Sequence, residues 1–135
     1  MAVPAEQSAD LACNIGDGSV VLGDYIFLLS RSTPRNLIKI KLTDYTDTTS
    51  LDLDAASPVG FTGGDAIITT GGFIWVASLD EGVILKINPG AGAAAPTYNS
   101  YVYISATGIT ALCTDDTYIF VGHANGSFSS YLLAS

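Results

Sequence analysis

Short runs of apolar and β-branched residues, separated by polar or glycine-containing turns, make up most of this chain. Near the end of the sequence, 109–113 and 118–122 are predicted as strands joined by a polar turn at 114–117, because β-branched and aromatic residues favour strands. Asn and Gly tolerate the backbone of a tight hairpin, so 124–126 is predicted as a turn leading into a third strand at 128–133. The pattern therefore predicts an antiparallel meander.

The same order of apolar run, turn and aromatic strand occurs twice more upstream. In each copy an isoleucine stands between two large aromatic side chains. The three copies are Tyr25-Ile26-Phe27, Phe73-Ile74-Trp75 and Tyr118-Ile119-Phe120. The dipeptides predicted to be equivalent downstream, with one extra residue in the first hairpin loop, are Lys39-Ile40, Lys86-Ile87 and Tyr131-Leu132.

A repeat of about 40 to 50 residues built from short strands is typical of propeller blades, each a sheet that cannot bury both of its faces alone. The chain resembles the β-propeller repeat class over nearly its whole length, although it has neither the Trp-Asp dipeptide nor the paired-glycine signature of a named repeat family. The resemblance implies an all-β fold of three four-stranded, propeller-like blades, half of a six-bladed ring completed by a second chain. A β-sandwich that uses the same strands is the alternative.

The length predicts a single domain, and the resemblance implies that it is β-propeller-like and spans 9–135, preceded by an N-terminal arm at 1–8. The predicted repeat units are 17–57, 58–106 and 107–135, with an extra strand at 10–15 before them. The strands predicted in unit one are 19–22, 25–30, 37–42 and 51–54, with turns at 16–18 and 43–49. Those predicted in unit two are 65–70, 73–78, 83–88 and 98–104.

Alternation within these strands predicts which side chains are buried. Lys39 and Lys41 are expected to face outward, with Ile40 and Leu42 toward the core. The residues expected to be mainly buried are Ile26, Phe27, Ile40, Ile74, Trp75, Ile87, Ile119 and Phe120.

Unit three has no fourth strand of its own in this pattern, and the strand at 10–15 is expected to supply it from a neighbouring subunit. The predicted assembly residues are Leu11, Cys13 and Ile15 on that strand, and Phe128, Tyr131 and Leu133 on the strand that it joins. Closed propellers have about four to eight blades, so three blades leave two apolar faces in water and two head-to-tail chains hide them. We therefore expect a homo-oligomer, with a dimer favoured, or a larger assembly in which other proteins cover those faces.

Composition and charge limit the cellular compartments and the classes of partner that are expected. With 48% hydrophobic and 13% charged residues, no apolar run of about 20 residues and no signal-peptide pattern, the chain is expected to be soluble, and cytoplasmic or in a virion. The net charge of −8, without a basic cluster, argues against nucleic acid and membranes as partners.

Few residues have side chains that could form a catalytic or metal-binding site. His123 is the only histidine, so sites built on several imidazoles are excluded and a surface or turn hydrogen-bonding role is expected. Cys13 and Cys113 are expected to be free and mostly buried thiols. Acidic pairs such as Asp115-Asp116 fall in predicted turns without calcium-loop spacing, so no metal and no cofactor are expected.

Three classes of function remain. A non-catalytic structural module for protein interaction is favoured, and its low charge and its small residues also resemble those of virus particle components. A lectin-like propeller that stacks sugars on the repeated aromatic residues is the alternative, although packing between blades explains those residues better. An enzyme is the least favoured, because propeller hydrolases need several His or carboxylate groups.

Overall fold

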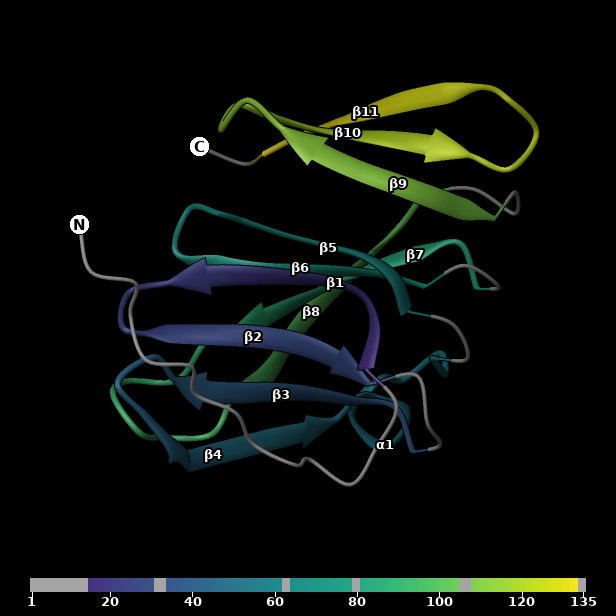
Figure 1. Cartoon of the computed structure of the whole chain (residues 1–135). Helices are drawn as coiled ribbons and strands as arrows, with labels where there is room; N and C mark the ends of the chain where they lie inside the picture. Colours follow the sequence, from purple (N-terminus) through teal and green to yellow (C-terminus); the bar gives the residue numbers. More distant parts are fainter. Residues whose placement is uncertain (1–14, 31–33, 62–63, 79–80, 105–107, 134–135) are drawn as a thin grey trace.

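The computed structural model describes residues 15–30, 34–61, 64–78, 81–104 and 108–133, which form three antiparallel sheets (Figure 1). The first sheet consists of β1 (Ile15–Leu22), β2 (Tyr25–Ser30), β3 (Asn36–Lys41) and β4 (Asp44–Asp52), and is followed by the helical turn α1 (Leu53–Ala56). The second sheet consists of β5 (Gly64–Thr70), β6 (Phe73–Ser78), β7 (Val83–Asn88) and β8 (Thr97–Tyr103). The third sheet consists of β9 (Ile109–Thr114), β10 (Tyr118–His123) and β11 (Phe128–Leu132).

The strands of each sheet follow their order in the chain, so each sheet is a meander joined by short turns. The sheets also follow one another in space, because β5 contacts both β1 and β9 (Figure 1). The all-β fold predicted from the sequence is therefore confirmed. No helix in the described part of the chain is long and apolar enough to cross a membrane.

Each sheet has two different faces, set by the alternation of side chains along its second strand. One face, the aromatic face, has the two aromatic residues of the repeat, such as Tyr25 and Phe27 in the first sheet. The other, the isoleucine face, has the isoleucine between them: Ile26, Ile74 or Ile119. Strand pairing places residues of the third strand on the same faces, so Lys39 lies opposite Phe27 and Ile40 opposite Ile26.

Two hydrophobic cores lie between consecutive sheets, and both combine an aromatic face with an isoleucine face. In the core between the first and second sheets, Phe27 and Leu29 pack with Ile74 and Ile87. In the core between the second and third sheets, Trp75 packs with Ile119 and Val121. The chain thus repeats one mode of sheet packing.

The first strand begins earlier than the sequence indicated. Ile15 belongs to β1 and pairs with Ser30, so it is not part of a separate strand, and residues 10–14 lie outside the described residues. The turn predicted at 16–18 was wrong, because these residues continue β1 through an irregularity between Ile15 and Ser19. Gly18 allows close sheet packing here, since a Cβ on it would lie 2.7 Å from Cγ2 of Ile67 on β5.

The last strand of the first sheet also differs from the prediction. The turn expected at 43–49 was wrong, because β4 begins at Asp44. Of the outer strand expected at 51–54, only 51–52 belongs to β4, because Leu53 begins a helical turn. Asp52 caps that turn, its side chain accepting a hydrogen bond from the backbone N–H of Ala55. Alternating threonine and serine side chains make β4 a half-exposed outer strand.

Pairing in the third sheet corrects the predicted repeat alignment. Ile119 pairs with Tyr131, as Ile26 pairs with Ile40. The equivalent of Lys39-Ile40 in unit three is therefore Ser130-Tyr131 rather than Tyr131-Leu132. The third sheet has three strands among the described residues, and β11 ends at Leu132.

Six of the eight side chains predicted to be mainly buried are buried. The exceptions are Ile26 and Phe120, which are half-buried. Ile26 lies on the isoleucine face of the first sheet and Phe120 on the aromatic face of the third. These are the outer faces of the three-sheet stack, and no further described sheet packs on them.

Candidate functional site

Among the hydrogen bonds of the described residues, those of the Lys39 side chain stand out, because one ammonium group donates four. Only 2% of the residue is exposed, so the prediction that it faces outward was wrong. Its ammonium group donates hydrogen bonds of 2.5 to 3.1 Å to the backbone carbonyls of Pro89, Gly90, Gly92 and Ala94 in the loop between β7 and β8. The second sheet therefore holds a lysine of the first sheet through backbone oxygen atoms alone.

Aromatic rings cover the other side of the same ammonium group. Nζ of Lys39 lies 4.4 Å from the ring centroid of Tyr25 and 5.9 Å from that of Phe27. Such cation–π contacts and the four carbonyls replace water around the charge. Burial nevertheless lowers the pKa of Lys39, and the nearby Asp47 carboxylate opposes that shift.

Lys86 occupies the equivalent position in the second sheet. It pairs with Trp75 as Lys39 pairs with Phe27, and it faces the third sheet. Its Nζ lies 4.0 Å from the ring centroid of Phe73 and 5.4 Å from that of Trp75. None of the described residues accepts a hydrogen bond from this ammonium group, in contrast to Lys39.

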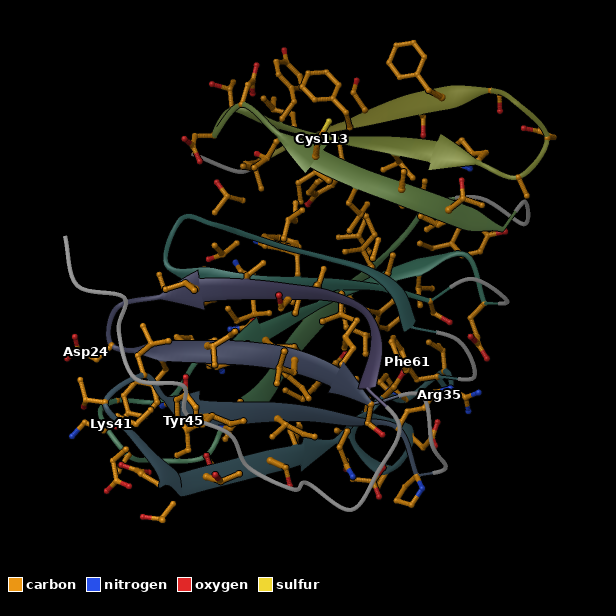
Figure 2. The ribbon with its side chains drawn as sticks, in the orientation of Figure 1. Asp24, Arg35, Lys41, Tyr45, Phe61 and Cys113 are labelled. Atoms are coloured by element: carbon orange, nitrogen blue, oxygen red, sulfur yellow. The ribbon has the colours of Figure 1, made fainter. Side chains whose placement is uncertain are left out.

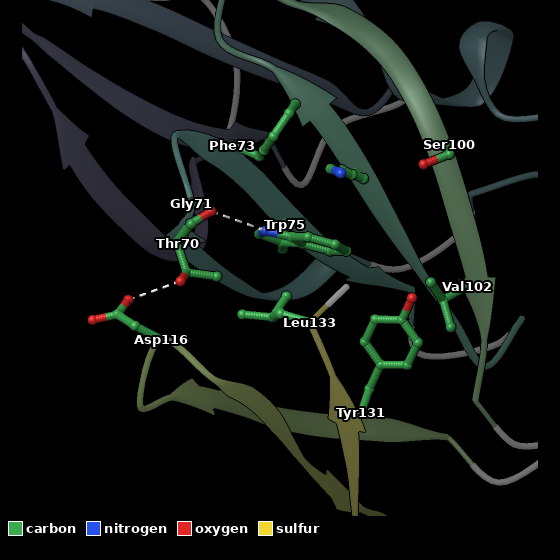
Figure 3. Close-up of a pocket in the computed structure, with 10 residues that line it drawn as sticks. Thr70, Gly71, Phe73, Trp75, Ser100, Val102, Asp116, Tyr131 and Leu133 are labelled. Atoms are coloured by element: carbon green, nitrogen blue, oxygen red, sulfur yellow. Dashed lines mark hydrogen bonds between the residues drawn. The ribbon is translucent and has the colours of Figure 1, made fainter. Parts of the chain in front are cut away.

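The space around Lys86 is a pocket of about 250 Å³ between the second and third sheets (Figure 3). Figure 3 shows Trp75 and Tyr131 on two of its walls, and the two ring centroids are 6.5 Å apart. At the rim, the hydroxyl of Thr70 donates a hydrogen bond of 2.8 Å to the carboxylate of Asp116. The pocket thus combines one cation, aromatic walls and a rim carboxylate that already has a donor.

The residues predicted for assembly fall in different places. Leu11 and Cys13 lie outside the described residues, and the backbone of Ile15 is in β1. Tyr131 and Leu133 pack against the core between the second and third sheets, so their burial needs no second chain. The side chain of Phe128, by contrast, is 74% exposed on the aromatic face of the third sheet.

Two residues with reactive side chains differ from expectation. His123 has the expected hydrogen-bonding role at the hairpin turn, where its backbone bonds Gly126 and Ser127, but it is buried rather than on the surface. Its Nε2 forms a hydrogen bond of 2.8 Å with the hydroxyl of Ser129. Its Nδ1 has no partner among the described residues. Cys113 is a free thiol, as expected, but it is exposed rather than buried, because it lies opposite Phe120 on the outer face of the third sheet (Figure 2).

The acidic pair Asp115-Asp116 shapes a turn, as the sequence indicated. The Asp115 carboxylate accepts hydrogen bonds from the backbone N–H groups of Thr117 and Tyr118, and these bonds lower its pKa. Asp116 has a positive φ of 69°, a conformation that Asp tolerates. Within the described ranges, no three His, Cys, Asp or Glu side chains are placed to hold a metal ion.

The repeated aromatic residues of the first two sheets serve packing between sheets. Phe27 and Trp75 are both buried in the cores, so the packing interpretation is confirmed for them. The role of Lys39 between the first two sheets was not predicted from the sequence. A signal was present, because lysine recurs at 39 and 86 at the same place in an apolar strand, where repetition is not expected of a merely solvent-exposed residue.

Comparison with known proteins gives no family for this chain. No protein-family model matches it, and no curated protein matches it.

Proposed function

We propose that this chain is a non-catalytic structural module whose sheets are three blades of a six-bladed, propeller-like ring closed by a second copy. In this ring, the aromatic face of the third sheet packs on the isoleucine face of the first sheet of the partner, and the reverse contact closes the ring. Both contacts are of the kind that already occurs twice within one chain. A two-fold axis relates them, so one interface serves both ends of the stack.

The main observation behind this proposal is the exposure of Phe128. Strand pairing makes Phe128 the equivalent of Leu37 in the first sheet and Ile84 in the second. Leu37 and Ile84 are 0% and 1% exposed because the next sheet covers them, whereas Phe128 is 74% exposed. Burying a phenylalanine of this kind is worth about 1.5 to 3 kcal/mol, which favours association.

The two outer faces also have no charged side chains at their centres, although the net charge of the chain is −8. On the first sheet, the rows of paired residues are Val21, Ile26, Ile40 and Thr48, and Ser19, Leu28, Ile38 and Ser50. On the third sheet, they are Cys113, Phe120 and Ser130, and Ala111, Gly122 and Phe128. Large uncharged apolar faces mark interaction sites on soluble proteins.

Exposure on these faces is uneven. Val21 is exposed and Ile26 and Leu28 are half-buried, whereas Ile38 and Ile40 are buried without belonging to either core. The third sheet is the more open of the two, with exposed side chains at Tyr118, Phe128 and Leu132. Formation of the proposed ring would therefore bury more surface on the third sheet than on the first.

The proposed ring also uses residues 10–14 of the neighbouring copy. The first two sheets have a fourth strand, and among the described residues β11 is the unpaired edge of the third. Leu11 and Cys13 alternate with Asp10, Ala12 and Asn14, so in a strand they would share one side. An exposed edge strand readily pairs with another chain, which makes β11 the acceptor.

The mass in solution tests the proposal. Light scattering of the full chain is expected to give twice its 14.0 kDa. Phe128→Asp places a carboxylate on the contact face and is expected to give a monomer. The matched control is Tyr103→Asp, since Tyr103 is also an exposed aromatic residue but lies on β8, away from both outer faces.

Cys113 supplies a second measurement in a Cys13→Ser background. Its exposed thiol is expected to react with a thiol reagent in the Phe128→Asp monomer and to be protected in the dimer. A full chain that remains monomeric at high concentration, or a Phe128→Asp variant that keeps the dimer mass, would overturn the proposal.

A further inference from the structure

Several polar side chains on the wall of the pocket around Lys86 (the Lys86 pocket) already form hydrogen bonds within the protein. Nε1 of Trp75 donates to the backbone carbonyl of Thr70 at 3.3 Å. The hydroxyl of Thr70 donates to the Asp116 carboxylate, and that of Ser100 donates to the side chain of the preceding residue. The donor groups of these three side chains are therefore not free for a ligand.

Two other polar groups of the pocket, the ammonium of Lys86 and the hydroxyl of Tyr131, have no hydrogen bond to any described residue. One side of the ammonium is covered by the Phe73 ring, whose centroid lies 4.0 Å from Nζ, and the side chain lines the pocket. Figure 3 shows the hydroxyl of Tyr131 pointing from β11 toward the second sheet. Because both groups are hydrogen-bond donors, a ligand in this pocket must present acceptor atoms to them.

The apolar part of the wall indicates the shape and size of such a ligand. The rings of Trp75 and Tyr131 are inclined at 55° to each other, and Val102 and Leu133 also line the pocket. A flat apolar group packs well on surfaces of this kind. The volume of about 250 Å³ lies just below the roughly 300 to 1,000 Å³ of pockets that hold drug-sized ligands, which indicates a smaller molecule.

Charge limits the ligand to a single negative charge. Among the residues that line the pocket, Lys86 is the only lysine or arginine, so it can neutralise one anionic group. The Asp116 carboxylate at the rim would repel a second negative charge. A monocarboxylate therefore suits the pocket better than a phosphate dianion, and its two oxygens match the two free donors.

We propose that the Lys86 pocket binds a small organic monocarboxylate with a flat apolar body. The carboxylate oxygens accept hydrogen bonds from the Lys86 ammonium and the Tyr131 hydroxyl, and the body lies against the Trp75 ring. The second and third sheets of one chain form the whole pocket, so this binding does not depend on the proposed ring.

Benzoate is the probe that tests this site in the full chain. Trp75 is the only tryptophan and lies on the wall of the pocket, so its fluorescence reports binding. Benzamide keeps the ring without the charge, and acetate keeps the charge without the ring. Each is expected to bind at least about tenfold more weakly than benzoate, because a hydrogen bond to a charged group and the burial of a ring each contribute about a factor of ten or more.

Substitutions identify the groups that hold the carboxylate. Lys86→Met removes the ammonium, keeps the apolar stem and is expected to weaken benzoate binding at least about tenfold. The matched control, Lys41→Met, removes the same charge from β3 and leaves the affinity unchanged. Tyr131→Phe removes only the hydroxyl and is expected to weaken binding about threefold to tenfold.

The outcomes separate this site from the proposed ring. Absence of benzoate binding, equal binding of benzoate and benzamide, or a folded Lys86→Met variant with wild-type affinity each overturns the site. The two probes need no substitution, so their comparison decides even if Lys86→Met does not fold. The Phe128→Asp variant is expected to bind benzoate as the wild type does, and loss of binding in its folded monomer would contradict a pocket formed by one chain.

Discussion

Lys39→Met removes the ammonium group that connects the first two sheets while keeping the length of its apolar stem. Four hydrogen bonds to the loop between β7 and β8 are lost. Of the four residues whose carbonyls are released, Gly92 and Ala94 are exposed and Pro89 and Gly90 are half-buried, so water has access to this loop. Each lost bond therefore costs about 0.5 to 1 kcal/mol, near the net value of a protein hydrogen bond, rather than the larger penalty of an unsatisfied buried group.

Losing the four bonds lowers the free energy of unfolding by about 2 to 4 kcal/mol. Part of this loss is offset, because burying a methionine side chain costs less than burying a charge. We therefore expect the free energy of unfolding to fall by about 2 kcal/mol, a large share of the stability of a small domain. The matched control is Lys41→Met, two residues along β3, where no described residue accepts a hydrogen bond from the lysine. A surface change of that kind is expected to cost less than about 0.5 kcal/mol.

Urea unfolding followed by fluorescence measures both variants. Trp75 is the only tryptophan and is buried in the second sheet, so its emission reports loss of the sheet packing. Because association adds to apparent stability, all samples need the same protein concentration. An Lys39→Met variant within about 0.5 kcal/mol of wild type would refute the claim that the loop is held by this lysine.

Three further predictions concern the backbone. Gly18→Ala is expected to cost about 1 to 3 kcal/mol in urea unfolding, because its Cβ meets β5. Gly90→Ala, with φ of 79° and the carbonyl of Ala94 in the way, is expected to destabilise more than Gly92→Ala, whose added Cβ meets nothing within 4 Å; equal costs would contradict this. Asp115→Ala is expected to weaken the turn before β10 most at neutral pH. The pKa of Asp115 is lowered in the folded state, so its contribution should shrink below pH 3.8, as a pH series of urea curves would show.

The strand pattern could be predicted because apolar runs and turn residues are local signals. The aromatic strands and the hairpin turn at Asn125 and Gly126 are present as expected. The turns predicted at 16–18 and 43–49 were wrong because glycine, serine and threonine, which often mark turns, lie within strands there. Gly18 lies in β1 to allow a close contact with β5, and the polar residues of β4 alternate on an outer strand, neither of which shows in a single segment.

The role of Lys39 could not be predicted from its own strand. Alternation placed Lys39 on the side opposite Ile40, which is true, but that side of the first sheet is the one that the second sheet covers. Its partners are contributed by a loop 50 or more residues away, and a sequence reading that treats charge as solvent-facing misses them. Comparison of equivalent positions in the repeat is the signal that finds such a residue.

Ile26 and Phe120, which were predicted to be buried but are half-buried, support the proposed ring. Their equivalents in the second sheet, Ile74 and Trp75, are buried by the sheets on either side. Stacked repeats need polar outer faces on their terminal units if nothing else covers them. The first and third sheets have apolar residues there instead, of the two kinds that pack together inside the chain. In the proposed ring, a second copy covers both of these faces at once, because each of its ends has the face that the other end lacks.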